Sequence, residues 1–135
     1  MDIVGPGFRI RKETVMAGKL VHFEVPAKDT SRALDFYKRT FGWAFQNFEG
    51  PVEYHITQLG EQLGGAVYPG DTGAVRVYFD VDDINAGAAK VKENGGKADD
   101  PMAVPGMGWF ATGEDTEGNP IGLWQTDPNA SAPEG

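Results

Sequence analysis

The chain has 135 residues, a formal net charge of −8 and no cysteine. The acidic balance, without a basic stripe, argues against binding to nucleic acid or to an anionic membrane, and the missing cysteines exclude disulfides, thiolate catalysis and cysteine zinc sites. No apolar run approaches the roughly 20 residues that span a bilayer, and 40% hydrophobic residues are enough for a core, so we expect a soluble, cytoplasmic, single-domain protein.

Both ends of the chain are predicted to lie outside the domain. The stretch "MDIVGPGFRIRKETV" has no clear hydrophobic period and precedes a second methionine, Met16. Residues 1–16 therefore indicate a leader or a disordered N-terminus, and the domain is expected over residues 17–127. The small, polar end of "TDPNASAPEG" predicts a mobile tail over residues 128–135.

The first ordered stretch predicts a strand, a helix and three further strands. In "LVHFEV" the alternation places His22 and Glu24 on one face of a strand. The amphipathic segment "TSRALDFYKRTF" predicts a helix, with Thr30 or Ser31 as N-cap and Gly42 as C-cap. Three short strand-like runs follow, "WAFQNF", "VEYHITQL" and "GGAVYP".

The same order of elements recurs 54 residues later. His22 then falls on Arg76 and Asp29 on Asp83, in a second strand "AVRVYFDV" and helix "DINAGAAKVKEN". The runs "KADDPMAV", "GWFATGED" and "PIGLWQT" complete the second unit. The chain is therefore expected to be α+β, with two βαβββ units over about residues 19–70 and 73–126. Paired, the units would form a curved sheet with a concave cup and the helices outside.

Several side chains are predicted to line this cup. Alternation aims Arg76 and Tyr78 inward together, and Gly122 shares a face with Trp124. A glycine there would leave room for a ligand beside the flat wall of Trp124, and Trp109 or its neighbour Phe110 would add another wall. The predicted ligand-binding residues are His22, Glu24, Arg76, Tyr78, Trp109 and Trp124.

The chain resembles the vicinal oxygen chelate superfamily, which includes glyoxalase I, extradiol dioxygenases and bleomycin-resistance proteins. The resemblance rests on "HFEVP", "FY" and "FGW" in the first unit, and on "FDVDDI", "NGGK" and "EGNPIGLWQ" in the second. It covers roughly residues 19–126, and its opening and ending are similar to glyoxalase-like proteins of actinobacterial type. It implies a homodimer.

The resemblance also implies metal ligands in the first and last strands of each unit. His22 matches the first place, but Arg76 and Gly122 stand where other ligands are expected, and residues 66–68 offer no good donor. A complete metal site is therefore not expected. A divalent metal held by His22 and Glu24 alone stays open.

Three functions remain open from the sequence. The first is binding of a small anionic or aromatic molecule, with Arg76 either anchoring the ligand or forming an internal ion pair with Glu24 beside His22. The second is a metal-dependent lyase, isomerase or oxygenase that acts on adjacent oxygens through His22 and Glu24. The third is metal-free acid–base catalysis by Glu24 with His22 or Arg76.

Overall fold

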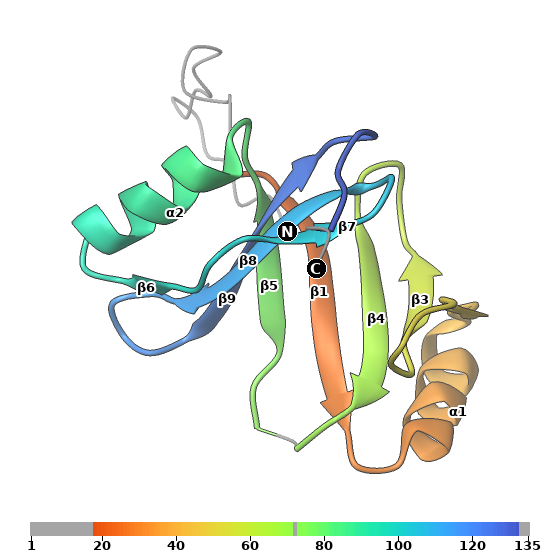
Figure 1. Cartoon of the computed structure of the whole chain (residues 1–135). Coiled ribbons are helices and arrows are strands. Elements are labelled where there is room, and N and C mark those ends of the chain that lie inside the picture. Colours follow the sequence, from red (N-terminus) through yellow and green to blue (C-terminus); the bar gives the residue numbers. More distant parts are fainter. Residues whose placement is uncertain (1–17, 72, 133–135) are drawn as a thin grey trace, which may run out of the picture.

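The computed structural model describes residues 18–71 and 73–132, which form a curved sheet flanked by two helices (Figure 1). The predicted leader, residues 1–16, lies outside the described residues, as do residues 133–135 of the predicted tail. The elements are β1 (Leu20–Ala27), α1 (Thr30–Phe41), β2 (Gln46–Asn47), β3 (His55–Gln58), β4 (Gly64–Pro69), β5 (Arg76–Asp80), α2 (Ile84–Glu93), β6 (Lys97–Ala98), β7 (Met102–Val104), β8 (Gly108–Glu114) and β9 (Pro120–Thr126).

The sheet confirms the prediction of two βαβββ units. Its strands follow the order β2-β3-β4-β1-β5-β9-β8-β6, and β7 also pairs with β8. In each unit the first strand pairs in parallel with the last, β1 with β4 and β5 with β9. The antiparallel pairing of β1 with β5 joins the units at the centre of the sheet. The fold is therefore α+β, as the repeat predicts.

The second unit departs from the prediction in one strand. "KADDPMAV" is divided into β6 and β7, both antiparallel to β8. The break falls at Asp99–Pro101, where the proline has no backbone N–H to donate to a ladder.

The caps of α1 explain where this helix begins and ends. The side chain of Asp29 accepts a hydrogen bond from the Arg32 amide at 3.0 Å, so the N-cap is Asp29, and the prediction of Thr30 or Ser31 is wrong. The prediction for the other end is confirmed, because Gly42 is the C-cap with a left-handed φ of 74°.

The hydrophobic core lies between α2 and the second unit's strands. Ile84, Ala88, Ala111 and Leu123 are buried together, and Phe79 is among the side chains packed against them. By contrast, α1 has no buried residue, and Phe36 and Phe41 are 55% and 61% exposed. The helices thus cover their parts of the sheet very unequally.

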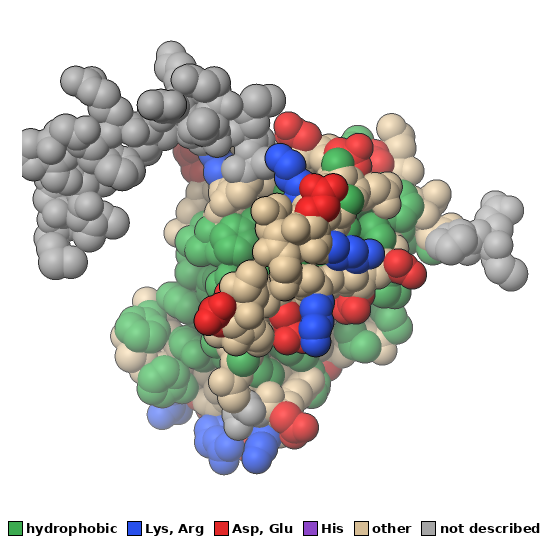
Figure 2. All heavy atoms as spheres, turned by 90° about the vertical axis from the view of Figure 1, so that its left-hand side faces the viewer, with side chains coloured by type: hydrophobic (Ala, Val, Ile, Leu, Met, Phe, Trp, Pro, Cys, Tyr) green, Lys and Arg blue, Asp and Glu red, His purple; other side chains and the backbone are tan. Residues whose placement is uncertain are grey.

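The surface over α2 is charged but mixed. Acidic and basic side chains are interspersed on the face of the molecule that carries α2 (Figure 2). Neither α1 nor α2, the helices of the described part of the chain, is long and apolar enough to cross a membrane.

Candidate functional site

Most of the predicted site residues lie on one face of the sheet. Across β1 and β5, His22 lies opposite Tyr78 and Glu24 opposite Arg76. Residues opposite each other in a ladder share a face. Gly122 on β9 lies beside Tyr78, and Trp124 follows two residues later on the same face. We call this the cup face and define it by His22, Glu24, Arg76, Tyr78, Gly122 and Trp124; α2 packs on the opposite face.

Two tyrosines hold the carboxylate of Glu24. The Tyr78 hydroxyl donates to Oε1 at 2.8 Å, and the Tyr54 hydroxyl donates to Oε2 at 2.9 Å. The Tyr54 hydroxyl also lies 2.6 Å from Nε2 of His22. His22 packs its ring edge against Tyr78, with centroids 5.5 Å apart. The result is a continuous hydrogen-bonded cluster of His22, Tyr54, Glu24 and Tyr78, which we call the Glu24 cluster.

Burial sets the charge of this cluster. Burial, reinforced by the Glu24 charge and by their hydrogen bonds to it, raises the pKa of both Tyr54 and Tyr78 far above the usual value for tyrosine. Burial also lowers the pKa of His22, although the Glu24 charge opposes this effect. At neutral pH the two phenols therefore remain protonated donors and His22 remains uncharged.

Tyr54 is the member of the cluster that is absent from the predicted ligand-binding residues. It comes one residue before β3, and the Phe48 amide bonds to its carbonyl. The only sequence signal is alternation, which puts Tyr54 and Ile56 on one face and His55 on the other.

Of the two roles left open for Arg76, the ion pair with Glu24 is not formed. Nη1 of Arg76 donates to the backbone carbonyl of Gly113 at 2.9 Å and to that of Ile121 at 2.5 Å. Among the described residues Arg76 has no carboxylate within ion-pair distance. The two oxygens of Glu24 accept from tyrosine hydroxyls instead.

The cation of Arg76 still acts on the cup face. The pKa of Tyr68 is raised mainly by burial and then by the Glu24 charge, while the Arg76 charge lowers it. Arg76 has the same opposing effect on the pKa of Tyr78. Its guanidinium thus lies within electrostatic reach of tyrosines from both units.

The space expected at Gly122 is filled. A Cβ atom on Gly122 would lie 2.3 Å from the ring carbon Cδ2 of Tyr78. The glycine therefore accommodates the Tyr78 ring and leaves no room there for a ligand.

The prediction that Trp109 lines the cup is also wrong. Trp109 packs against the core beneath α2, and its indole Nε1 donates to Asp127 at 3.0 Å. Its neighbour Phe110 is the residue that pairs with Trp124 on the cup face. The register of β8 against β9 decides between the two, which alternation alone left open.

The donor set does not fit a complete metal site. Across residues 18–71 and 73–132 no group of three or more His, Cys, Asp or Glu side chains could hold an ion. Arg76 and Gly122 supply no ligand at the places that the resemblance implies. The remaining candidates, His22 Nε2 and both oxygens of Glu24, already share hydrogen bonds with tyrosines.

Two open hollows lie away from the cup face. One, of about 360 Å³, is formed by residues 47–53, before β3. The other, of about 440 Å³, lies at the N-terminal end of α2, between Asp82, Trp109 and Gln125.

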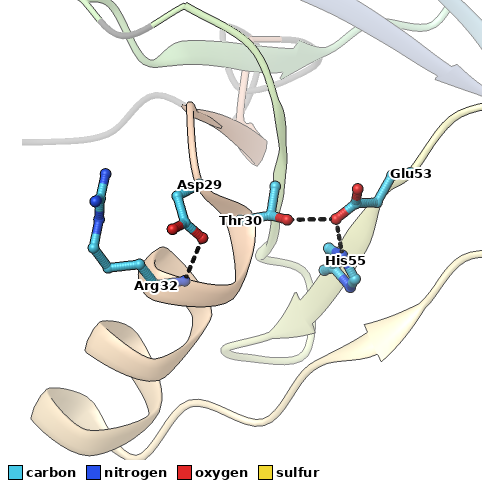
Figure 3. A network of polar contacts seen from close by, with 5 residues as sticks. All are labelled: Asp29, Thr30, Arg32, Glu53 and His55. Carbon is cyan, nitrogen blue, oxygen red and sulfur yellow. Dashed lines mark hydrogen bonds and ion pairs between the residues drawn. The ribbon is translucent and has the colours of Figure 1, made fainter.

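A second polar network ties α1 to the strand beside it (Figure 3). Glu53 accepts a hydrogen bond from the Thr30 hydroxyl at 2.6 Å and lies 2.7 Å from Nε2 of His55. This arrangement accounts for His55, for which the sequence predicts no ligand role.

Residues 19–123 match the family described as the Glyoxalase/Bleomycin resistance protein/Dioxygenase superfamily. The chain belongs to this superfamily. It is 35% identical over 121 residues to a "Glyoxylase-like domain-containing protein" of Didymella fabae, covering 78% of this chain and 91% of the relative. It is 32% identical over 108 residues to "Putative glyoxylase CFP32" of Mycobacterium tuberculosis, covering 75% of this chain but only 41% of that protein. The mycobacterial relative agrees with the resemblance to an actinobacterial-type branch.

Solved structures share the fold at low sequence identity. A methylmalonyl-CoA epimerase of Streptomyces coelicolor has a TM-score of 0.66 at 12% identity, over 84% of this chain and 98% of that chain. A hypothetical protein of Bacillus halodurans has a TM-score of 0.67 at 15% identity, with the same coverage. At these identities the likeness concerns the fold alone.

Proposed function

We propose that this superfamily member binds a small anionic, partly aromatic molecule on the cup face without a complete metal site. The observation that carries this proposal is Arg76. Arg76 is half-buried, and its Nη1 donates to two backbone carbonyls. Among the described residues it has no ion-pair partner. A guanidinium has five N–H donors, so others remain for a carboxylate or a similar anion.

The surroundings of Arg76 favour a ligand with a flat apolar part. Tyr68 on β4 lies within electrostatic reach of Arg76. Trp124 and Phe110 lie further along the same face, because Trp124 is opposite Asp80, four residues after Arg76. Aromatic walls around a few fixed polar groups are typical of small-molecule sites. The Glu24 cluster is internally bonded, so it contributes a fixed shape next to Arg76.

Calorimetric titration with simple aromatic acids, such as benzoate and salicylate, tests this proposal. We expect saturable binding by the wild type, a loss of at least about tenfold in affinity for Arg76→Gln, and no effect of a chelator. Arg39→Gln, on the exposed last turn of α1, is the matched control and should bind like the wild type. Equal binding by Arg76→Gln and the wild type would contradict the role of Arg76.

The alternative is an enzyme that uses a divalent metal on a substrate with adjacent oxygens, as a lyase, isomerase or oxygenase. Membership of a superfamily that contains dioxygenases supports it. Metal content measured by mass spectrometry, after incubation with Ni, Zn, Mn or Fe(II), separates the two functions. Stoichiometric metal that is lost in His22→Ala would favour the enzyme, whereas its absence in all four incubations would favour metal-independent binding.

We further infer a homodimer and a cytoplasmic location. The dimer is supported by the exposed aromatic side chains of α1, which no other described part of this chain covers. The acidic composition and the lack of cysteine support the location.

A further inference from the structure

The Tyr54 hydroxyl lies between a histidine nitrogen and a carboxylate oxygen. It is 2.6 Å from Nε2 of His22 and 2.9 Å from Oε2 of Glu24. Both distances are those of ordinary hydrogen bonds. The contacts come from β1 and from the residue before β3, two segments about 30 residues apart in the chain.

Counting protons assigns a direction to each bond. A charged carboxylate has no hydrogen to give, so the single hydroxyl hydrogen of Tyr54 must point to Glu24. The contact between Tyr54 and His22 then needs a hydrogen from the other side. His22 must supply it from Nε2, because the phenol oxygen has only a lone pair left for this contact.

The packing around Tyr54 keeps this arrangement in place. Its ring contacts Phe48 edge-on, at 6.3 Å between centroids, and Tyr68 at 6.4 Å. Glu24 cannot rotate away freely, because Tyr78 holds its other oxygen at 2.8 Å. The Tyr54 ring and the Glu24 carboxylate are therefore each held by contacts outside the bond between them.

We infer that Tyr54 is a positioning residue: its hydroxyl joins His22 to Glu24 in the way a bound metal ion would, and it fixes His22 as the tautomer that carries hydrogen on Nε2. Nδ1 is then the nitrogen with the lone pair, and His22 serves the cup face as a hydrogen-bond acceptor. This inference does not depend on which ligand binds, so it stands apart from the proposed function.

The arrangement also explains why His22 and Glu24 are a poor metal site. A divalent ion that bridges Nε2 of His22 and Oε2 of Glu24 would have to displace the Tyr54 hydroxyl from both atoms and remove the hydrogen from Nε2. The hydrogen-bond partner of one ring nitrogen determines which nitrogen of a histidine carries the hydrogen.

Nuclear magnetic resonance of the imidazole nitrogens tests the tautomer directly. The chain has two histidines, so a His55→Gln variant assigns the signals of His22 in a long-range proton–nitrogen correlation spectrum. At pH 8, where histidine is neutral, we expect the Nε2–H pattern for His22 in the wild type. In Tyr54→Phe, which keeps the ring but removes the hydroxyl, we expect that pattern to give way to a mixture of tautomers.

Tyr68→Phe is the matched control, because it removes a hydroxyl from a neighbouring ring that is outside the Glu24 cluster. It should leave the His22 signals unchanged. An Nδ1–H pattern in the wild type would overturn the inference. An unchanged pattern in Tyr54→Phe, or an equal change in Tyr68→Phe, would do the same.

A zinc titration gives a second readout that general loosening of the fold would not produce. We expect Tyr54→Phe to bind Zn²⁺ more tightly than the wild type, and the double variant Tyr54→Phe/His22→Ala to lose that gain. Thermal unfolding of each variant checks that it is folded. Zinc affinity that is the same in Tyr54→Phe and the wild type would count against the hydroxyl as the group that keeps metal out.

Discussion

The ring of Tyr78 over Gly122 makes this glycine sensitive to a single methyl group. Gly122→Ala would place its Cβ 2.3 Å from the ring and push Tyr78 away from Glu24. We expect a loss of roughly 1–3 kcal/mol in the free energy of unfolding, measured by urea titration. Gly60→Ala is the control, since nothing lies within 4 Å of a Cβ there. A stability for Gly122→Ala within experimental error of the wild type would show that Tyr78 moves aside freely.

Thr57 presents the opposite case, a polar group that the fold does not use. The residue is 2% exposed, and its hydroxyl has no hydrogen-bond partner in the described part of the chain. Thr57→Val should therefore stabilise the protein, by about 1 kcal/mol in urea unfolding, because an unpaired buried hydroxyl costs free energy. In the control Thr112→Val, a hydroxyl that donates to Asp99 at 2.8 Å is lost, so no gain is expected. Destabilisation of Thr57→Val would indicate a hidden partner.

The face of the sheet on which a side chain lies could be predicted from the sequence, but its hydrogen-bond partners could not. Alternation placed His22, Glu24, Arg76 and Tyr78 on one face, as the register shows. That Glu24 bonds to tyrosines, and Arg76 to backbone carbonyls, depends on side-chain reach across strands, which no spacing encodes. The signal for Tyr54 was equally weak, because its hydroxyl meets a carboxylate 30 positions earlier.

The N-cap of α2 allows a test of how this helix begins. Asp83 accepts hydrogen bonds from the Asn85 and Ala86 amides, at 2.9 and 3.1 Å. Asp83→Ala should cost about 1 kcal/mol of stability in urea unfolding. Asp82→Ala, one residue earlier, removes the same charge without removing the cap and should cost much less. Equal losses in both would mean that charge, and not capping, is what matters here.

Elements with a clear hydrophobic periodicity could be predicted from the sequence, whereas the place where a strand is interrupted could not. The α1 boundaries of Thr30–Phe41 match "TSRALDFYKRTF", whose apolar face repeats clearly. The division of residues 97–104 was missed because two adjacent aspartates and a proline were counted as part of one strand. The N-cap of α1 was misplaced by one or two residues, since Asp29, Thr30 and Ser31 are all good capping types and only geometry separates them.

The uncovered face of α1 leads to a prediction for the assembled molecule. Phe36, Tyr37 and Phe41 contact one another edge-on or stacked, yet Phe36 and Phe41 are more than half exposed. If a second copy covers them, Phe36→Gln/Phe41→Gln should convert a dimer to a monomer in sedimentation velocity. Leu59→Gln, a change at an exposed apolar side chain in the turn after β3, should remain dimeric. A wild type that is monomeric at high concentration would contradict this pairing.

Acid should weaken the whole fold, because His22 is buried in its neutral form. Its folded pKa lies below the ordinary 6.5, mainly through burial. The unfolded chain therefore binds a proton at His22 more readily than the folded chain does. The contribution of neutral His22 to the free energy of unfolding is complete above pH 6.5 and is lost as the pH falls below it. Hydrogen bonds from Thr30 and His55 lower the pKa of Glu53 below its ordinary 4.5, so a further loss is expected under more acidic conditions.

Urea unfolding at a series of pH values measures this dependence. Between pH 6.5 and 5 the wild type should lose stability with a slope of no more than about 1.4 kcal/mol per pH unit. His22→Gln, which has no proton to gain, should show a flatter profile over this range. Stability that rises on acidification would contradict the assignment of His22 as buried and neutral.

The central place of β1 and β5 has a consequence for synthesis on the ribosome. β1 is made first and gains β4 and then β5 as neighbours, but β5 must wait for β9, whose first residue comes about 40 residues after β5 ends. At about 5–20 residues per second, one edge of β5 stays bare for roughly 2–8 seconds. A bare strand edge recruits other strands. The yield of correctly folded protein should thus depend on how fast the second half of the message is translated.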